Sequence, residues 1–357
     1  MSQRILLAGG GTAGHIEPAL AVADEITKQR SDITCEFLGT DGALESLLVP
    51  KRGYRLHSIN KAVLPRKVSP SIAMFPFRLS LSLLQALRAL KGVDLLIGFG
   101  GYVSAPAYLA ATLKRIPIVI HEANAKPGWA NRLGRHFAHV TAVNFENVRR
   151  QWPGAVLTGM PIRQSLTNLN AVADKKAFRD LQCRSWGFDP AKPVVAIFGG
   201  SQGSLHINKV IAEFLQSRTD IQLIHAVGIN NPLPDSRPHY LPLPYFHDMA
   251  AIYGAADLLV TRSGAVTCSE LSSIGKYAIL IPLPHGNGEQ VDNAQALVDQ
   301  GAAMMVPNDN FSAAWLASNI DQALKNAARF QPAHVGSNSQ AASRIAQLAL
   351  SLLSERS

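Results

Sequence analysis

Short apolar segments, many of them bounded by glycine, alternate with helical patterns along the chain. In the first half they span residues 4–9, 33–39, 93–101, 116–122 and 139–143, and in the second half residues 194–200, 221–228, 257–264, 277–283 and 302–307. Segments that are apolar on both faces are typical of parallel strands covered by helices on each side. The sequence therefore predicts an α/β fold.

One arrangement occurs twice, about half a chain apart. The glycine turn GGGTAGH follows the strand at 4–9, and GGSQGS at 199–204 follows the strand at 194–198. Each turn leads into a helical pattern, so we expect two Rossmann-like parallel-sheet domains facing each other across a cleft. We place the domains at 1–160 and 161–338, and we expect the C-terminal helical pattern, at about 339–357, to pack back on the first domain.

Charge and cysteine usage narrow the classes of partner. The 357 residues include 34 Lys and Arg against 25 Asp and Glu, a net charge of +9 that favours phosphorylated small molecules or an anionic membrane. No nucleic-acid-binding motif is found, so no nucleic-acid partner is expected. Three widely spaced cysteines, at 35, 183 and 268, indicate a reducing compartment and no metal site. No secretion signal or membrane-spanning segment is recognised.

The first glycine turn raises the question of a dinucleotide. Gly9, Gly11 and Gly14 fit the G-x-G-x-x-G pattern. An NAD site also needs an acidic residue about 20 residues further on, at the end of the second strand. Here that strand ends in FLGT and Asp41 follows it, which disfavours NAD. The amides of both turns lie at helix N-termini, so each turn is a candidate phosphate or diphosphate site.

A series of motifs in a fixed order carries a resemblance to a known family. The motifs are GGGTAGHIEPALAVA, GFGGYVSAPAYLAA, HEANAKPGWANRL, GMPIR, GGSQGS, TRSGAVTCSEL and PHGNGEQVDNA. Together they resemble glycosyltransferase family 28, over residues 5 to about 306. The resemblance implies the two-domain B-type glycosyltransferase fold, with the acceptor in the first domain and the nucleotide sugar in the second.

The resemblance also implies an activity. It points to an inverting, metal-independent hexosyltransferase of peptidoglycan synthesis that works without a cofactor. The enzyme would move N-acetylglucosamine from UDP-N-acetylglucosamine to the 4-hydroxyl of undecaprenyl-pyrophosphoryl-N-acetylmuramoyl-pentapeptide. Two alternatives stay open: an enzyme like UDP-N-acetylglucosamine 2-epimerase, and a non-catalytic nucleotide-sugar or dinucleotide-binding module. Transfer requires a base for the attacking hydroxyl and groups that stabilise the departing diphosphate.

The first glycine turn is expected to serve the acceptor. Thr12, Ala13 and Gly14, together with the amides of residues 10–14, would hold the acceptor diphosphate. His15 is a candidate either for the base or for a binder of acceptor phosphate, since an ordinary histidine titrates near physiological pH. The two roles are left open.

Two later motifs supply further candidates in the first domain. Glu122 is the rival base, and it could equally cap the turn that follows its strand. Tyr102 and Asn124 match family positions near the acceptor or the catalytic centre, and each could also be a hydrogen-bonded loop residue.

The donor is expected to contact residues from several motifs. They are Thr12, Ala13, Gly14, His15, Asn124, Arg163, Ser201, Gln202, Phe246, Ala265, Val266, Thr267, Glu270, Glu289, Gln290 and Asn293. Among them, Glu270 is expected to accept both ribose hydroxyls, unless it is an acid on the helix surface. Arg163 is expected to contact the diphosphate, with a salt bridge between the domains as the alternative. Phe246 matches a position that contacts uracil.

Two positions depart from the family pattern. Ala13 replaces a glycine, which makes the turn slightly less free. Glu289 replaces a common glutamine, and a carboxylate accepts hydrogen bonds but cannot donate them. Neither change removes a group that the chemistry requires.

Residues 63–91 combine apolar and cationic side chains. The expected membrane-contacting residues are Arg66, Lys67, Met74, Phe75, Phe77 and Arg78. Such a segment suits the surface of an anionic bilayer, although it also fits a loop followed by an ordinary core helix. A lipid-linked acceptor favours the first reading. We therefore expect a peripheral protein on the cytoplasmic side of the cell membrane, with cell-wall synthesis or division proteins as further partners.

Overall fold

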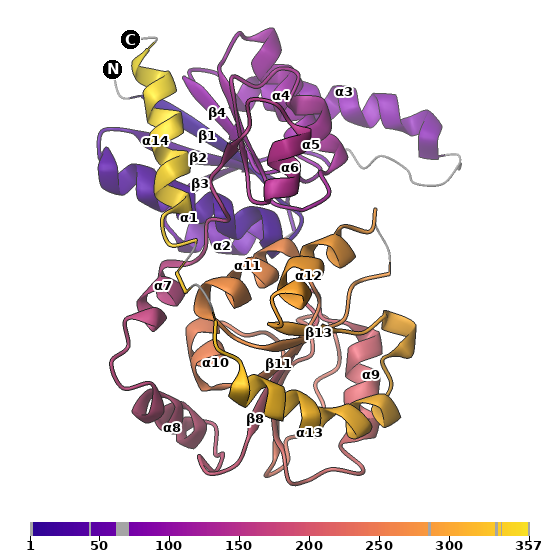
Figure 1. Cartoon of the computed structure of the whole chain (residues 1–357). Helices are drawn as coiled ribbons and strands as arrows, with labels where there is room; N and C mark the ends of the chain where they lie inside the picture. Colours follow the sequence, from indigo (N-terminus) through magenta and orange to yellow (C-terminus); the bar gives the residue numbers. More distant parts are fainter. Residues whose placement is uncertain are drawn as a thin grey trace. The chain divides into compact units, whose positions relative to one another are not determined.

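The chain divides into two compact units. The computed structural model describes residues 3–42, 44–61, 71–284, 287–332, 335–336 and 338–355, and for residues 71–75 it describes the main chain alone. Unit 1 comprises Met1–Arg163 and Asn338–Ser357, and unit 2 comprises Gln164–Ser337 (Figure 1).

Unit 1 is built on a parallel sheet in which the strand order is β3-β2-β1-β4-β5-β6-β7. The strands are β1 (Arg4–Ala8), β2 (Thr34–Gly39), β3 (Arg55–Ser58), β4 (Leu95–Gly98), β5 (Ile118–Glu122), β6 (Val140–Val143) and β7 (Val156–Leu157). The helices are α1 (Ala13–Gln29), α2 (Glu45–Lys51), α3 (Ser71–Ala89), α4 (Ser104–Leu113), α5 (Trp129–Gly134), α6 (Glu146–Gln151) and α14 (Ala341–Ser354).

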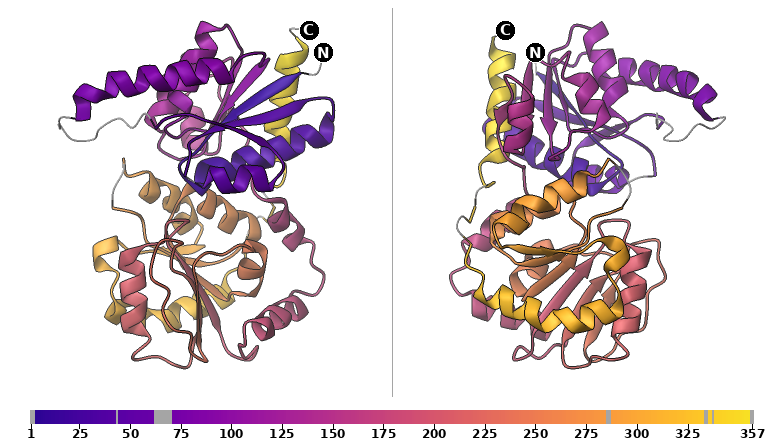
Figure 2. Two further views of the ribbon diagram at one scale, coloured as in Figure 1. Left: turned by 180° about the vertical axis from the view of Figure 1, so that it is seen from behind. Right: turned by 45° about the vertical axis from the view of Figure 1, so that its right-hand side comes forward.

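The two faces of this sheet have separate apolar cores. Ile5 and Leu7 of β1 point to the face covered by α1 and α14. Leu6 and Ala8 of the same strand point to the face covered by α4 and the end of α3. Helices therefore lie on both sides of the sheet (Figure 2), which is why its strands are apolar at successive positions.

The last helix, α14, belongs to unit 1. Ile345, Ala346 and Ala349 are fully buried in the same core as Val22 and Ile26 of α1. A hydrogen bond of 3.2 Å from Gln29 Nε2 to Ser343 Oγ also joins the two helices. The C-terminal helix therefore completes the apolar core of unit 1, to which the N-terminal strand and helix also belong.

Unit 2 repeats the design with the parallel strand order β10-β9-β8-β11-β12-β13. The strands are β8 (Val194–Phe198), β9 (Gln222–Ala226), β10 (Tyr240–Leu243), β11 (Leu258–Thr261), β12 (Ala278–Leu280) and β13 (Ala303–Met305). The helices are α7 (Gln164–Asn170), α8 (Lys175–Ser185), α9 (Leu205–Phe214), α10 (Met249–Ala255), α11 (Ala265–Ile274), α12 (Glu289–Asp299), α13 (Ala313–Arg329) and the 3-10 helix η1 (Asn308–Asn310).

Both sheets have the Rossmann strand order, which confirms the predicted α/β fold with two Rossmann-like sheets. In each sheet the first strand lies beside the fourth, at β1–β4 and at β8–β11. At such a point the connections leave in opposite directions, and a crevice opens at the carboxyl ends of the two strands. Both glycine turns follow strands at these points.

Candidate functional site

The first turn, between β1 and α1, needs glycine at several positions because of its backbone conformation and because neighbouring atoms approach closely. Gly11 has a φ of +87°, which favours glycine. A Cβ atom on Gly10 would lie 2.5 Å from Glu45 Oε1, and one on Gly101 would lie 2.5 Å from the Gly10 carbonyl oxygen. The turn after β4 therefore packs directly on the turn after β1. Thr12 precedes α1 in an extended conformation, and Ala13 is the first residue of the helix.

His15 lies in the first turn of α1, beside the turn after β1 and the turn after β4. Its Nδ1 is 3.1 Å from Thr12 Oγ1. A Cβ atom on Gly100 would lie 3.4 Å from the Cδ2 atom of the ring, so the imidazole lies directly against this glycine. Burial lowers the pKa of His15, while the Gly10 main chain and the charge of Glu45 act in the opposite direction. The structure thus favours a neutral imidazole held by Thr12.

Tyr102 lies next to the first glycine turn. A Cβ atom on Gly11 would lie 3.6 Å from Tyr102 Cδ2, and the tyrosine is 36% exposed. The neighbouring strands β1 and β4 therefore bring Thr12, His15 and Tyr102 together at one edge of the sheet.

Glu45, which the sequence patterns do not single out, holds the first turn through hydrogen bonds. Its fully buried carboxylate accepts hydrogen bonds from the Gly11 amide at 3.0 Å, the Thr40 amide at 2.9 Å and Thr40 Oγ1 at 2.7 Å. We expected the amides of residues 10–14 to hold the acceptor diphosphate. For Gly11 this expectation is wrong, because its amide already donates to Glu45.

Glu122 ends β5, and both of its oxygens accept hydrogen bonds from the loop and the helix α5 that follow. Oε1 accepts from the Asn124 amide at 2.9 Å and from Asn124 Nδ2 at 3.3 Å. Oε2 accepts from the Gly128 amide at 3.2 Å and from Asn131 Nδ2 at 3.0 Å. Burial raises the pKa of Glu122, and these donors act against that rise. The carboxylate therefore orders the loop that carries Asn124.

A buried chain of hydrogen bonds fixes this loop further. Tyr108 Oη donates to Asn131 Oδ1 at 2.7 Å, and Asn131 Nδ2 also donates to the His121 carbonyl oxygen at 3.1 Å. A Cβ atom on Gly100 would lie 3.4 Å from Asn131 Nδ2, at the same glycine that borders His15. The network around Glu122 and the His15 ring are thus separated by a single glycine.

Arg163 forms an ion pair inside unit 1. Its Nε lies 3.4 Å from Glu17 Oε2 on α1, and both side chains are mostly buried. The salt bridge that the structure shows is therefore not one between the two units.

In unit 2, the turn at 199–204 packs tightly against the end of β9. Gly200 and Gly203 have φ angles of +93° and +73°. A Cβ atom on Gly203 would lie 2.1 Å from the Val227 carbonyl oxygen, so no other residue fits. Asn231 Nδ2 donates to the Gln202 carbonyl oxygen at 3.3 Å, and Ser204 caps α9. Ser201 and Gln202 lie at the tip of this ordered turn.

The helix after β11 begins at Ala265, and its N-cap is a glycine. Gly264 has no side chain to cap the amides of Ala265, Val266 and Thr267. Farther along α11, Glu270 is 2% exposed and accepts a hydrogen bond from Tyr253 Oη at 2.9 Å. The alternative of a helix-surface acid at Glu270 is therefore wrong.

The start of α12 carries three of the expected donor residues. Glu289 Oε2 accepts from the Asn287 amide at 3.0 Å, and Gln290 Oε1 accepts from the Leu283 amide at 3.0 Å. Asn293 is fully buried, and its Nδ2 donates to the Ser263 carbonyl oxygen at 3.3 Å. Phe246 is buried too, and the centroid of its ring lies 5.9 Å from that of Phe198.

Helix α3 projects from the rest of unit 1 (Figures 1 and 2), and several of its apolar side chains are exposed. Phe77 is 66% exposed, Leu81 38% and Leu84 56%. They occupy positions i, i+4 and i+7, which lie on one face of a helix, and Arg78 is exposed beside them. Of the other expected membrane residues, Arg66, Lys67 and the side chains of Met74 and Phe75 lie outside the described residues. None of the described helices is long and apolar enough to cross a bilayer.

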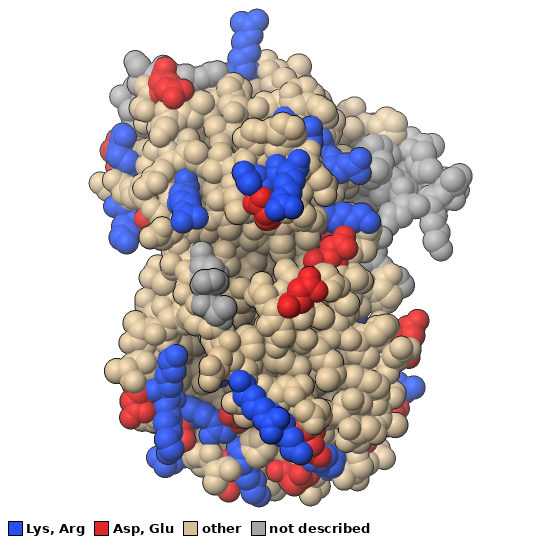
Figure 3. Space-filling model, viewed as in Figure 1, with Lys and Arg blue, Asp and Glu red and all other residues tan. Residues whose placement is uncertain are grey.

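Basic side chains are not confined to α3. Figure 3 shows Lys and Arg spread over this face of both units rather than gathered in one patch. Among the described residues, no group of three or more His, Cys, Asp or Glu is close enough to hold a metal ion.

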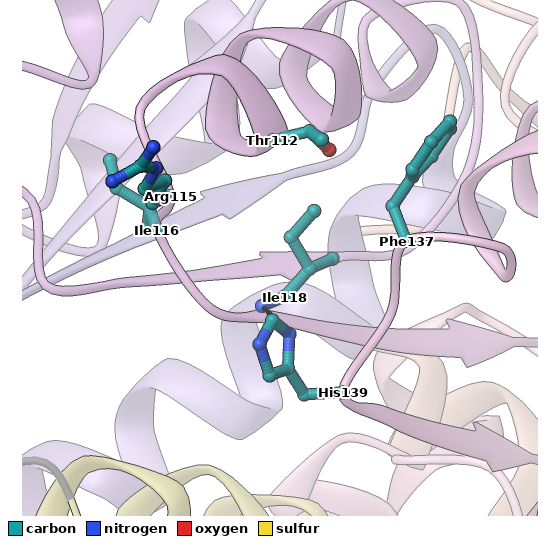
Figure 4. Close-up of a pocket in the computed structure, with 6 residues that line it drawn as sticks. All are labelled: Thr112, Arg115, Ile116, Ile118, Phe137 and His139. Atoms are coloured by element: carbon teal, nitrogen blue, oxygen red, sulfur yellow. Dashed lines mark hydrogen bonds between the residues drawn. The ribbon is translucent and has the colours of Figure 1, made fainter.

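A cavity of about 250 Å³ lies at the opposite edge of the unit 1 sheet, beside the amino ends of β5 and β6 (Figure 4). Ile116, Ile118 and Phe137 contribute apolar surface, and Thr112, Arg115 and His139 complete the lining. Because the glycine turn follows the carboxyl end of β1, this cavity is separate from the candidate site.

Both halves of the chain match known sequence families. The glycosyltransferase family 28 N-terminal domain matches residues 5–143, and the family 28 C-terminal domain matches residues 194–349. The UDP-N-acetylglucosamine–N-acetylmuramyl-(pentapeptide) pyrophosphoryl-undecaprenol N-acetylglucosamine transferase of Corynebacterium diphtheriae is 43% identical over 87% of this chain and 84% of its own. The enzyme of the same name from Streptomyces avermitilis is 42% identical over 88% of each chain.

Solved structures share the fold. MurG of Acinetobacter baumannii matches with a TM-score of 0.66 and 26% identity over 98% of this chain and 99% of its own. UDP-GlcNAc 2-epimerase of Neisseria meningitidis, bound to UDP-GlcNAc, matches with a TM-score of 0.68 and 15% identity over 98% of this chain and 100% of its own. At that identity the second match concerns the fold alone.

Proposed function

Given that the chain belongs to glycosyltransferase family 28, we propose that it transfers N-acetylglucosamine from UDP-N-acetylglucosamine to undecaprenyl-pyrophosphoryl-N-acetylmuramoyl-pentapeptide. The transferases of that name share 42 and 43% of their residues with it over most of the chain. The observation that carries the proposal is the pair of glycine turns at the switch points of the two sheets. The first turn leads into a helix that carries a titratable histidine, His15, and the helix α11 of unit 2 carries a buried carboxylate, Glu270, that suits a ribose.

The proposed reaction is a displacement at C1 of the donor sugar. The 4-hydroxyl oxygen of the acceptor attacks C1 while the bond from C1 to the UDP oxygen breaks, so UDP leaves with the electron pair and C1 is inverted. The hydroxyl proton must pass to a base. In the tautomer in which Nδ1–H donates to Thr12 Oγ1, the lone pair of His15 Nε2 is free to take this proton.

Two features favour His15 over Glu122 as the base. Burial lowers the pKa of His15, which keeps the imidazole neutral and also makes it a weaker partner for phosphate. Each oxygen of Glu122 already accepts two hydrogen bonds, from the loop that follows it and from Asn131 of α5. In this proposal Glu122 keeps Asn124 in place near the acceptor, and Thr12, Ala13, Gly14 and Tyr102 line the same edge.

The donor is proposed to bind unit 2. The uncapped amides of Ala265, Val266 and Thr267 suit a diphosphate, because helix N-termini attract anions. Buried Glu270 suits the ribose hydroxyls, while Ser201 and Gln202 lie at the tip of the glycine turn and Phe246 is proposed to contact uracil. Glu289, Gln290 and Asn293 are proposed to contact the sugar, and Arg163, Asn124 and the first glycine turn to complete the donor contacts.

One experiment tests the transfer directly. UDP-N-acetylglucosamine and the lipid-linked acceptor are incubated with the protein in the presence of EDTA, and the disaccharide product is measured. We expect product without added metal. Turnover of the donor alone, by epimerisation or hydrolysis, would instead favour the epimerase-like alternative. Donor binding without turnover in the presence of the acceptor would favour a non-catalytic module.

We further propose that the protein is peripheral to the cytoplasmic face of the cell membrane. The exposed face of Phe77, Leu81 and Leu84 on α3, with Arg78 beside it, supports contact with an anionic bilayer. Such contact would place the enzyme next to an acceptor whose polyprenyl tail remains in the membrane.

A further inference from the structure

Arg262 links the ends of three neighbouring strands in unit 2. It follows β11 directly and is 7% exposed. Its Nη2 donates to Ser204 Oγ, at the end of the glycine turn after β8, at 2.8 Å. Its Nη1 donates to the carbonyl oxygens of Ile281 and Pro282, just after β12, at 3.1 and 3.3 Å. One planar guanidinium thus ties together the three connections that leave this edge of the sheet.

The adjacent Ser263 extends the link to α12. Ser263 Oγ donates to the Gln290 carbonyl oxygen at 2.8 Å, and Gln290 Oε1 accepts from the Leu283 amide at 3.0 Å. Arg262 and Ser263 therefore hold both ends of the connection between β12 and α12. That connection leads to the residues proposed to contact the sugar.

The charge of Arg262 has no counter-charge among the described residues. All three of its acceptors are neutral oxygens, and its buried Nε finds no acceptor in the described part of the chain. Burial alone accounts for the lowered pKa of this residue, with no carboxylate acting on it. A buried, unpaired cation is unfavourable, so its presence favours an anion that binds nearby.

The candidate anion site is close in the sequence and in the fold. Gly264, two residues on, is the uncapped N-cap of α11, and Ser204 caps α9 from the glycine turn. Both helix N-termini lie at the edge that Arg262 organises. Their partial positive charges add to that of the guanidinium.

We propose that Arg262 is a positioning residue of the donor half, and that the diphosphate of the bound nucleotide supplies its missing counter-charge. This inference rests on the proposed function, because it takes UDP as the ligand of unit 2. Arg262 acts through the turn and the connection that it holds, and through its charge, rather than as a group that touches the reacting atoms.

Binding of UDP and of uridine to the full chain separates this role from a merely structural one. Isothermal titration in EDTA gives both dissociation constants for the wild type and for Arg262→Met and Arg262→Lys. A charged contact that loses its charge weakens binding about tenfold or more. The quantity to compare is the ratio of the dissociation constant of uridine to that of UDP. We expect Arg262→Met to weaken the binding of UDP about tenfold more than that of uridine, and so to lower this ratio about tenfold. Arg262→Lys should keep the ratio within about threefold of the wild type.

Control variants and contrary outcomes complete the test. Arg218→Met removes a charge from unit 2 that is already paired with Asp220 and Asp321, and should leave the ratio unchanged. An equal loss for both ligands in Arg262→Met, or no loss, would overturn the inference. If Arg262→Met does not fold, as judged by circular dichroism, a tenfold fall in the ratio for Arg262→Lys would overturn it instead, and an unchanged ratio would support it. A wild type that does not bind UDP would overturn the proposed function itself.

Discussion

At the scale of single residues, the His15 ring gives the sharpest prediction. The base must be neutral to take a proton, and burial holds the pKa of His15 below its ordinary value of 6.5. We therefore expect kcat/KM to stay constant above that ordinary value and to fall only as the pH drops through the lowered pKa. Initial rates between about pH 5 and pH 9 measure this profile.

Variants of His15 and of its hydrogen-bond partner Thr12 distinguish a base from a phosphate binder. His15→Ala should reduce kcat by about a hundredfold or more with little change in the acceptor KM. Thr12→Val should reduce kcat less, since it removes the partner of Nδ1 but keeps the ring. A rise in acceptor KM at constant kcat would contradict the base role and support phosphate binding.

Glu45 should matter as much as residues that face the substrate. In Glu45→Gln, Oε1 can still accept from Thr40, while an amide group replaces Oε2 opposite the Gly11 amide and leaves two donors facing each other. We expect a loss of about 1–3 kcal/mol in stability and a marked fall in activity. Glu146→Gln, at an exposed ion pair, is the matched control and should change neither by much in thermal melts and rate assays.

Glu270 should affect the donor and not the acceptor. Glu270→Gln keeps the shape of the side chain but weakens a charged acceptor for ribose hydroxyls, so the KM for the donor should rise about tenfold. The acceptor KM should stay constant in the same steady-state assay. Equal effects on both constants would argue against the ribose role.

Several site residues could not be predicted from the sequence because their partners lie far along the chain. The glycine turns and their helices have local signatures, and the structure contains both. Glu45, by contrast, meets Gly11 across 34 residues, and Arg262 meets Ser204 across 58. No short pattern records such contacts, since they arise only when parallel strands bring their connections to one edge.

At the scale of elements, the strands that the sequence does not predict share a position. β3, β7 and β10 are all edge strands, each with a single neighbour. The residues of β7 are exposed, those of β3 are at most half-buried, and β10 contains Pro242. Central strands are buried on both faces and therefore form apolar runs, whereas an edge strand need not, and it tolerates proline.

The exposed face of α3 predicts a defined membrane phenotype. Replacing Phe77 and Leu84 by serine removes apolar surface that would otherwise enter the bilayer, so binding to vesicles with anionic lipid should fall about tenfold or more. Leu181→Ser, on α8 of unit 2, is the matched control because that leucine is 63% exposed. Equal cosedimentation of all variants would contradict the membrane role of α3.

At the scale of the whole molecule, the two units should respond to different perturbations. Ile345→Ala opens a cavity in the core that α14 shares with α1, and should cost about 2–5 kcal/mol of unit 1 stability. Ser351→Ala, on the exposed side of α14, is the control. Saturating UDP should raise the unfolding temperature of unit 2 in the same calorimetric scans. Stabilisation of unit 1 alone by UDP would contradict the proposal that the donor binds unit 2.

The return of α14 to unit 1 also fixes an order of events during synthesis. The strands and helices of unit 2 are all synthesised before Ile345, Ala346 and Ala349, so unit 1 waits for its last helix until the whole of unit 2 has been made. Until then, the apolar side chains of α1 that α14 covers remain open to water or to a chaperone. The half of the protein that is begun first is therefore the half that is finished last.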